Sequence, residues 1–179
     1  MNKNVKKLTM MAMLSAISVV LVYLVRFPVF PAAAFLEYDP ADIPVLIGGF
    51  MYGPLAGIAI TVIASAVQAF TVSAANGIYG FLMHVIATSA LVITSSVIYK
   101  AMKKTNKGEI IGLICGTAMM CGVMMIANHY ITAYYFQLDR SIVDAMLIPT
   151  ILPFNFIKAG VNSLIAFLVR KPLKKVADM

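Results

Sequence analysis

The sequence predicts an all-α integral membrane protein, a bundle of six transmembrane helices with both termini in the cytoplasm. Three observations predict this fold. Of the 179 residues 61% are hydrophobic and 12% are charged, the mean hydropathy is +0.93, and the basic residues gather beside long apolar runs. A soluble domain carries about 25% charged residues. So apolar a chain cannot cover its surface with polar groups, which excludes a soluble enzyme, a nucleic-acid-binding domain and a disordered segment.

The apolar runs predict where the helices lie. A helix needs about 20 apolar residues to cross the hydrocarbon of a bilayer. Four runs are long enough, at approximately 8–25, 79–99, 110–135 and 145–169. The run over 43–72 is interrupted by Gly53-Pro54, and proline cannot continue a preceding helix undisturbed. We therefore expect two helices there, at 43–52 and 54–72, and a single transmembrane domain over residues 1–179.

The distribution of charge supports two crossings in the interrupted run. Eleven of the fourteen basic residues form three short clusters: Lys3, Lys6 and Lys7; Lys100, Lys103, Lys104 and Lys107; and Arg170, Lys171, Lys174 and Lys175. Cytoplasmic segments carry such an excess of lysine and arginine. Two crossings over 43–72 place all three clusters on the cytoplasmic side, whereas one crossing would separate them. The first and last outside loops then hold Glu37, Asp39, Asp42, Asp139 and Asp144.

Polar residues inside the predicted helices indicate a binding pocket. Lys158 lies well inside the last helix, and Asn155 and Asn162 share its face because they are three and four residues away. Ionisable residues within a bilayer are costly and mark functional sites. Other helices add further polar groups: Asn128 and His129 on the fifth, His84 on the fourth, Gln68 on the third and Asn76 just beyond it.

These polar groups lie in the outer and middle parts of the bundle, at about 1.5 Å of rise per residue. The inner half is nearly all Ala, Val, Ile, Met and Gly. A pore would need polar lining along its whole length, so the pattern favours a pocket that is open outside and closed below. Alternatively, the Asn and His side chains hold helices together. Aromatic residues near the outer ends, among them Tyr38 and Tyr79, either stack on a planar ligand or form an interfacial belt.

The sequence lacks the patterns of the common catalytic sites. It contains no phosphate-binding G-x-x-x-x-G-K-[ST] loop and no H-E-x-x-H zinc motif. Neither a nucleophile–base pair nor paired membrane aspartates are evident. Cys115 and Cys121 are six residues apart, on different helical faces, and are expected to be reduced. We expect no enzyme activity, no cofactor, no metal and no nucleic-acid partner.

Several motifs resemble those of a known family. They are Ala12-Met-Leu-Ser-Ala16, Phe27-Pro-Val-Phe-Pro31, Tyr38-Asp-Pro-Ala-Asp-Ile-Pro44, Tyr52-Gly-Pro-Leu-Ala-Gly57 and Leu152-Pro-Phe-Asn-Phe-Ile-Lys-Ala159. Over essentially its whole length the chain resembles the substrate-binding S components of energy-coupling factor (ECF) vitamin transporters, most closely the riboflavin-binding group. Two positions differ: Ala64-Ser65 and His84 stand where many flavin-binding relatives have Lys-Asn and Asn.

The resemblance implies a function. Such a subunit binds a vitamin outside the prokaryotic plasma membrane and associates with a membrane coupling subunit and two cytoplasmic ATPases. Asn128, Asn155 and Lys158 would contact riboflavin, and the loop with Tyr38 and Asp39 would help to cover it. His84 and Gln68 complete the predicted substrate-binding residues, and Ala12 and Ala16 match the motif that docks on the coupling subunit. The alternatives are another water-soluble vitamin or precursor, an autonomous small secondary carrier, and a membrane scaffold that does not transport.

Overall fold

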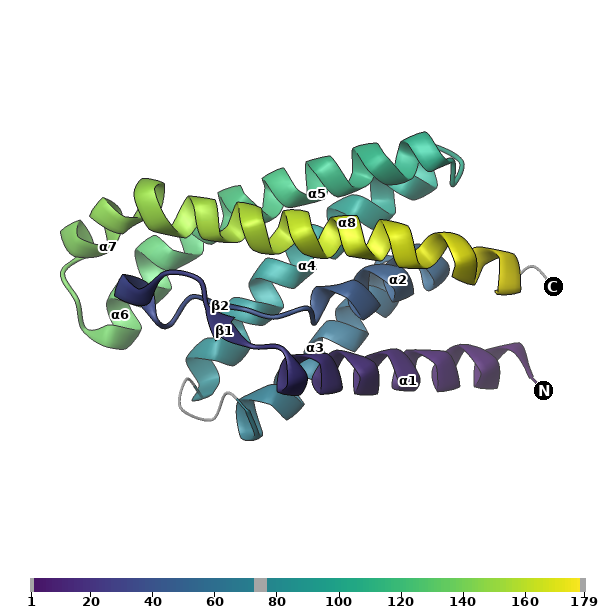
Figure 1. The fold of residues 1–179 in the computed structure, drawn as a ribbon, viewed down its shortest axis with the longest axis horizontal. Coiled ribbons are helices and arrows are strands. Elements are labelled where there is room, and N and C mark those ends of the chain that lie inside the picture. Colours follow the sequence, from purple (N-terminus) through teal and green to yellow (C-terminus); the bar gives the residue numbers. More distant parts are fainter. Residues whose placement is uncertain (1, 73–76, 178–179) are drawn as a thin grey trace.

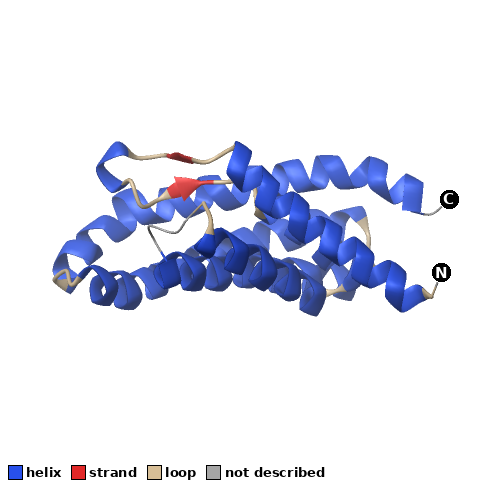
Figure 2. Ribbon diagram, turned by 90° about the horizontal axis from the view of Figure 1, so that it is seen from below, coloured by secondary structure: helices blue, strands red, loops and turns tan. Residues whose placement is uncertain are grey.

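The computed structural model describes residues 2–72 and 77–177 and is a bundle of long helices (Figures 1 and 2). Four helices run along it: α1 (Lys3–Leu24), α4 (Gly77–Ala101), α5 (Asn106–Ala127) and α8 (Leu152–Ala177). Two shorter ones, α2 (Asp42–Tyr52) and α3 (Pro54–Phe70), pack between them. A small hairpin pairs β1 (Phe27–Pro28) with β2 (Glu37–Tyr38), antiparallel, around the 3₁₀ turn Pro31–Ala33.

The last two predicted helices begin earlier than expected, at Asn106 and Arg140, and each contains a π-helical segment within its predicted bounds. α5 passes through the π segment Asn128–Thr132 into α6 (Ala133–Phe136), and α7 (Arg140–Met146) passes through the π segment Leu147–Ile151 into α8. The described residues contain four helical segments long and apolar enough to cross a membrane: Lys3–Leu24, Gly77–Ala101, Asn106–Phe136 and Arg140–Pro172. α2 and α3 are shorter, so the six crossings remain a prediction.

Helix ends follow local signals in the sequence. Asn2 accepts a hydrogen bond from the backbone N–H of Asn4, so α1 begins at Lys3 rather than near Leu8. Thr105 caps α5 in the same way through the N–H of Gly108. Between α2 and α3, Gly53 has φ 92° and ψ 172°, a conformation that side chains disfavour, and Pro54 opens α3. The predicted break is therefore present at Gly53-Pro54.

Glycines set the close approach of α5 to α4. A Cβ on Gly112 would lie 2.6 Å from the carbonyl oxygen of Ser95, and one on Gly116 would lie 2.8 Å from that of Leu91. Gly112 and Gly116, one turn apart on α5, therefore serve packing within the chain. Ala12 and Ala16, in contrast, lie on the exposed face of α1, which packs on α2 and α3 through other residues.

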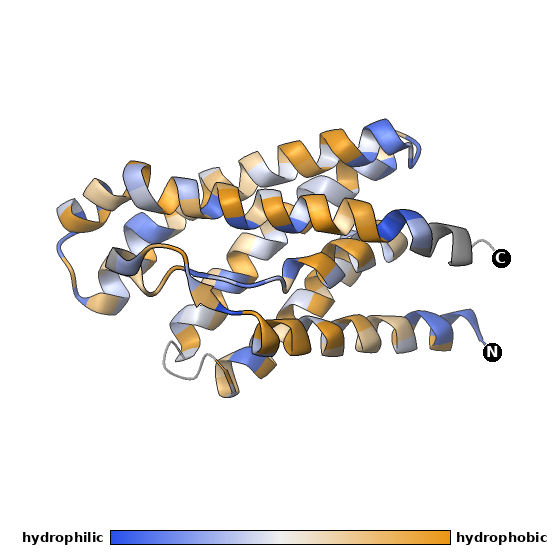
Figure 3. Cartoon of the chain, viewed as in Figure 1, coloured by the Kyte–Doolittle hydropathy of each residue, from blue (hydrophilic) through white to orange (hydrophobic). Residues whose placement is uncertain are grey.

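The two ends of the bundle differ in charge. Both termini and the turn between α4 and α5 lie at one end, which we call the terminal end (Figure 1). The opposite end, with β1, β2, α6 and α7, is called the hairpin end. Hydrophilic residues mark the terminal end at the start of α1 and at the α4–α5 turn (Figure 3). The three basic clusters thus share one end of the molecule, as the charge pattern predicts.

Candidate functional site

A cavity lies between the hairpin and the adjoining parts of α3, α4, α5 and α8. Six of the seven predicted substrate-binding residues line it: Asp39, Gln68, His84, Asn128, Asn155 and Lys158. Tyr38 does not line it, and its hydroxyl instead donates to Oδ1 of Asn162 over 2.9 Å. Asn76 lies outside the described residues. Residues more than a hundred positions apart in the sequence therefore meet at this cavity.

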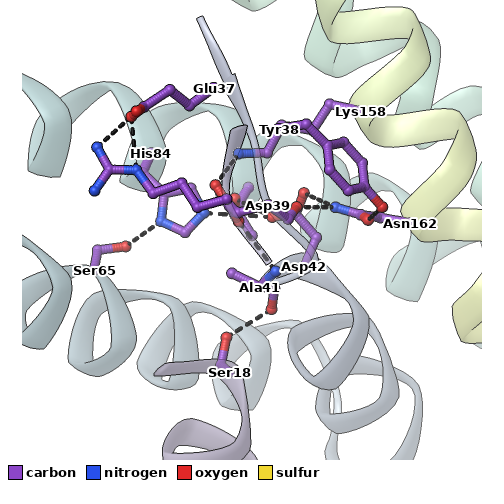
Figure 4. A network of polar contacts seen from close by, with 12 residues as sticks. Ser18, Glu37, Tyr38, Asp39, Ala41, Asp42, Ser65, His84, Lys158 and Asn162 are labelled. Atoms are coloured by element: carbon purple, nitrogen blue, oxygen red, sulfur yellow. Dashed lines mark hydrogen bonds and ion pairs between the residues drawn. The ribbon is translucent and has the colours of Figure 1, made fainter. Parts of the chain in front are cut away.

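The buried Lys158 is neutralised by Asp39. Its Nζ lies 2.6 Å from Oδ2 of Asp39, and the two side chains are 8% and 11% exposed (Figure 4). Oδ1 of Asp39 accepts from the backbone N–H of Ala41, and its carbonyl oxygen accepts from Nδ2 of Asn162. A charge taken out of water requires such a partner. The pair joins the loop after β2 to α8 and forms part of the cavity wall.

Asp42, the first residue of α2, is the main site residue that the sequence reasoning missed. Its side chain is fully buried. Oδ1 accepts from the Thr88 hydroxyl over 2.6 Å, and Oδ2 accepts from Nδ2 of Asn162 over 2.9 Å (Figure 4). The sequence signal was Asp39-Pro-Ala-Asp42, whose second carboxylate lies at the start of an apolar run. Asn162 thus holds Tyr38, the Asp39 backbone and Asp42 together under the cavity.

Two buried side-chain polar atoms at the cavity wall, one on α3 and one on α4, have no hydrogen-bond partner. His84 Nδ1 lies 2.7 Å from the Ser65 hydroxyl, which orients the ring. His84 Nε2 is buried 3.6 Å from Oδ1 of Asp42, within ion-pair distance of that carboxylate but without a hydrogen bond. Gln68 Nε2 is likewise buried and unbonded. Buried polar groups are normally hydrogen-bonded, so these two at the cavity wall are suited to receive a ligand.

The two asparagines are fixed by their own helices beside the π segments. Nδ2 of Asn128 donates to the Met124 carbonyl over 2.7 Å, and Nδ2 of Asn155 donates to the Ile151 carbonyl over 2.8 Å. The Thr132 hydroxyl donates to Oδ1 of Asn128. Oδ1 of Asn155 makes no hydrogen bond to any residue that the structure describes. Because π segments recur at functional sites, their position here fits a binding role.

Aromatic rings line the cavity at the hairpin end. Tyr79, Phe35 and Phe154 contribute to its wall. The Tyr79 ring stacks on Tyr135 with centroids 4.7 Å apart, and its hydroxyl shares a 2.8 Å hydrogen bond with Thr132. These rings offer flat apolar surface beside the polar atoms of the wall.

Further contacts hold the hairpin on the cavity. Nε of Arg26 donates to Oε2 of Glu37 over 2.7 Å, and Nη1 of Arg26 donates to the carbonyl of Val72, just after α3. Burial, reinforced by the nearby Asp39 carboxylate, raises the pKa of Tyr38, so its hydroxyl stays protonated and donates to Asn162. The hairpin is thus joined to α3 on one side and to α8 on the other.

We predicted that the inner half of the bundle is nearly all apolar. This prediction is wrong at one polar cluster near the terminal end. Nη1 of Arg170 lies 2.5 Å from Oε2 of the buried Glu109, and Nη2 donates to the Tyr99 hydroxyl. Its guanidinium lies over the Phe50 and Tyr99 rings, 4.9 and 4.5 Å from their centroids. Arg170 belongs to a basic cluster in the sequence, but in the structure it joins α2, α4, α5 and α8. We call Arg170 and these three partners the terminal cluster.

The described residues contain no group of three or more His, Cys, Asp or Glu side chains that could hold a metal ion. Cys115 is exposed and Cys121 buried, and neither forms a disulfide. The site therefore consists of hydrogen-bonding groups, compensated charges and aromatic rings.

Comparisons with known proteins agree with this description. The family described as the ECF transporter, substrate-specific component, matches residues 6–170. The riboflavin transporter FmnP of Bacillus subtilis is 33% identical over 178 residues, covering 95% of this chain and 93% of that protein. The riboflavin transporter RibU of Staphylococcus aureus is 29% identical over 154 residues, covering 83% and 80%. A structure described as the S component of a bacterial ECF transporter matches with a TM-score of 0.87 and 28% identity, covering 99% of this chain and 100% of that one.

Proposed function

The chain belongs to the substrate-specific components of ECF transporters, and we propose that it is the riboflavin-binding subunit of such an ATP-driven importer. Two relatives similar over most of the chain are riboflavin transporters, which supports riboflavin as the substrate. The chain itself would bind and carry the vitamin without catalysing a reaction. Riboflavin is then a substrate and not a cofactor.

The observation that carries this proposal is the set of unbonded polar atoms around a cavity with aromatic walls. Oδ1 of Asn155, Nε2 of His84 and Nε2 of Gln68 lack hydrogen-bond partners among the described residues. A flavin presents alternating donors and acceptors on the edge of its ring system, which amide groups recognise. Its flat ring suits the rings of Tyr79, Phe35 and Phe154. The hydroxyls of its sugar-derived chain would take the remaining polar groups, with Lys158 and Asp39 beside them.

The membrane arrangement forms part of the proposal. Residues 1–179 would form one transmembrane domain that crosses the prokaryotic plasma membrane six times, with the terminal end in the cytoplasm. The cavity would then open to the outside beneath the hairpin. The exposed Ala12 and Ala16 would allow close approach of a helix from the membrane coupling subunit. Two cytoplasmic ATPases bound to that subunit would hydrolyse ATP.

Purification and spectroscopy test the substrate. The detergent-purified chain should carry a yellow flavin chromophore or, once stripped, quench riboflavin fluorescence at micromolar concentration. Asn155→Ala should weaken binding about tenfold or more, since a hydrogen bond in a buried site is lost. Asn106→Ala, at the exposed start of α5, is the matched control and should bind normally.

The outcomes separate the alternatives. No riboflavin binding, with tight binding of another vitamin, would replace the substrate but keep the class of transporter. Uptake into vesicles without ATPase partners would identify an autonomous carrier. Binding of no vitamin at all would leave a scaffold. Equal affinity of Asn155→Ala and the wild type would remove the proposed site.

A further inference from the structure

A second concave surface lies on the outside of the bundle, between α5 and α8. This α5–α8 groove encloses about 730 Å³ and is lined along α5 from Ile110 to Met125 and along α8 from Leu152 to Phe167. Hydrophobic residues dominate both helices along this stretch (Figure 3). The hydroxyls of Thr117 and Ser163 are its only polar side-chain groups. The cavity described above has other lining residues, so the groove is a separate site.

The groove is open at two positions where glycine has no side chain to fill it. A Cβ added at Gly122 on α5 or at Gly160 on α8 would meet no atom within 4 Å. Ala118 and Cys121 add little volume beside them. Neither glycine is needed for helix packing, in contrast to Gly112 and Gly116, whose added Cβ would collide with α4. The two glycines therefore shape an open surface.

The length and lining of the groove match a hydrocarbon chain. From Ile110 to Met125 the groove runs about 22 Å at the helical rise. One leaflet contributes about 15 Å of hydrocarbon, so an acyl chain that enters at the terminal end can lie in the groove along the whole length of the acyl chain. An unfilled apolar hollow loses dispersion contacts, which an acyl chain would restore.

Cations lie at the end of the groove nearest the termini. Nζ of Lys171 lies 4.6 Å from the ring centroid of Phe167, the last groove residue on α8. Lys107 is exposed one turn before Ile110, the first groove residue on α5. Glu109, the acidic residue beside them in sequence, is buried against Arg170 and does not neutralise them. The positive charge stands where the headgroup of a lipid in that leaflet would lie.

We propose that the α5–α8 groove binds an acyl chain of an anionic phospholipid, whose phosphate is held by Lys107 and Lys171. The proposal rests on the proposed function only in placing the chain in a membrane with the terminal end at a lipid headgroup layer. The lipid would fill a fixed groove on the wall formed by α5 and α8, while Ala12 and Ala16 on α1 face outward on another helix. Riboflavin, the coupling subunit and the lipid would thus each use a different surface of the chain.

Native mass spectrometry of the full chain tests the proposal. The purified protein is mixed with phosphatidylglycerol and phosphatidylcholine that carry the same acyl chains. We expect phosphatidylglycerol to be retained preferentially, and Lys171→Gln or Lys107→Gln each to reduce that preference about fivefold. Gly122→Leu and Gly160→Leu, which fill the groove, should release the bound lipid. Cys115→Leu is the matched control, because Cys115 is exposed on α5 but does not line the groove.

Riboflavin titration of the same samples keeps the two proposals distinguishable. Loss of lipid in the glycine variants with unchanged riboflavin binding supports the groove. Equal retention of the two lipids by the wild type, or full retention after Gly122→Leu and Gly160→Leu, overturns it. If those variants keep the lipid but fail to assemble with a coupling subunit, or change the oligomeric state, a protein helix occupies the groove and the proposal is wrong. Lipid binding without riboflavin binding would overturn the proposed function alone.

Discussion

Three pairs of a lysine or arginine with a carboxylate compensate charge in the part of the chain that the structure describes. Lys158 meets Asp39 beside the cavity, Arg170 meets Glu109 near the terminal end, and Arg26 meets Glu37 at the hairpin. The first two pairs are largely removed from solvent. Removing one member of such a pair leaves an unpaired buried charge and is strongly destabilising, whereas removing both can be nearly neutral. Roles in stability and in binding can therefore be separated by experiment.

The pair of Lys158 and Asp39 offers that separation. Lys158→Met alone should lower the free energy of unfolding by about 3 kcal/mol, because Asp39 loses its partner. The double variant with Asp39→Asn should recover most of this loss. Thermal unfolding in detergent measures the stability of both single variants and the double one.

Riboflavin titration completes that experiment. If Lys158 contacts the ligand, the double variant stays weak in binding although its stability is restored. Strictly additive losses of stability would contradict the coupling of the two side chains. Normal riboflavin affinity of the double variant would contradict a ligand-contact role for the pair.

Spacing within one helix could be predicted from sequence, and partners from distant segments could not. The i, i+3 and i+4 rules predicted a shared face for residues near Lys158, and Lys158 and Asn162 both contact Asp39. Asp42 was assigned to a loop because its partners Thr88 and Asn162 lie far along the chain. Arg170 was grouped with exposed lysines for the same reason. The role of each substrate-binding residue stays a prediction.

At the scale of elements, breaks in the helices matter most. Gly53-Pro54 was readable from sequence because both residue types have strong backbone preferences. The π segments Asn128–Thr132 and Leu147–Ile151 were not, since one additional residue per turn hardly disturbs an apolar pattern. The helices near 110–135 and 145–169 were consequently predicted as continuous α-helices. In the structure the backbone hydrogen-bonding register of each changes at its π segment beside the cavity.

Gly53 provides a test at this scale. Gly53→Ala should lower the free energy of unfolding by about 1–3 kcal/mol, because φ 92° with ψ 172° is a glycine conformation. No atom lies within 4 Å of the added Cβ, so the loss would reflect backbone strain and not a collision.

Gly122→Ala is the matched control for that variant. It also has open space around its Cβ but lies inside helix α5, where alanine is favoured by up to about 1 kcal/mol. Thermal unfolding should therefore shift in opposite directions for the two variants. Equal stabilisation of both variants would show that the α2–α3 junction is not strained.

At the scale of the whole molecule, the sequence predicted the helical S-component fold and the common end of the basic clusters. Composition and apolar runs suffice for a helical membrane bundle, because few arrangements bury so much apolar surface. The S-component fold itself was implied only by the motifs that resemble that family. Hydropathy does not reveal whether the short α2 and α3 cross a bilayer, since each is sheltered by neighbouring helices. The number of crossings and the orientation remain predictions.

Ala12→Trp tests how the molecule joins its partners. A tryptophan on the exposed face of α1 should block close approach of the coupling subunit. Uptake by cells that contain the complete importer should be abolished, while riboflavin binding to the purified subunit stays unchanged. Met119→Trp, at an exposed position of α5 outside the groove, is the control and should transport normally. Retained uptake by Ala12→Trp would remove the docking assignment.

The terminal cluster affects how readily a bound molecule could pass from the cavity toward the termini. A solute moving from the cavity toward the termini would have to part Arg170 from Glu109 and from the rings of Phe50 and Tyr99. Separating a buried ion pair costs about 3–5 kcal/mol, so the separated arrangement would be only a small fraction of the molecules at equilibrium. A subunit that is reconstituted alone in a sealed vesicle should therefore retain its bound vitamin. The free energy for releasing the vitamin on the other side would have to come from another protein.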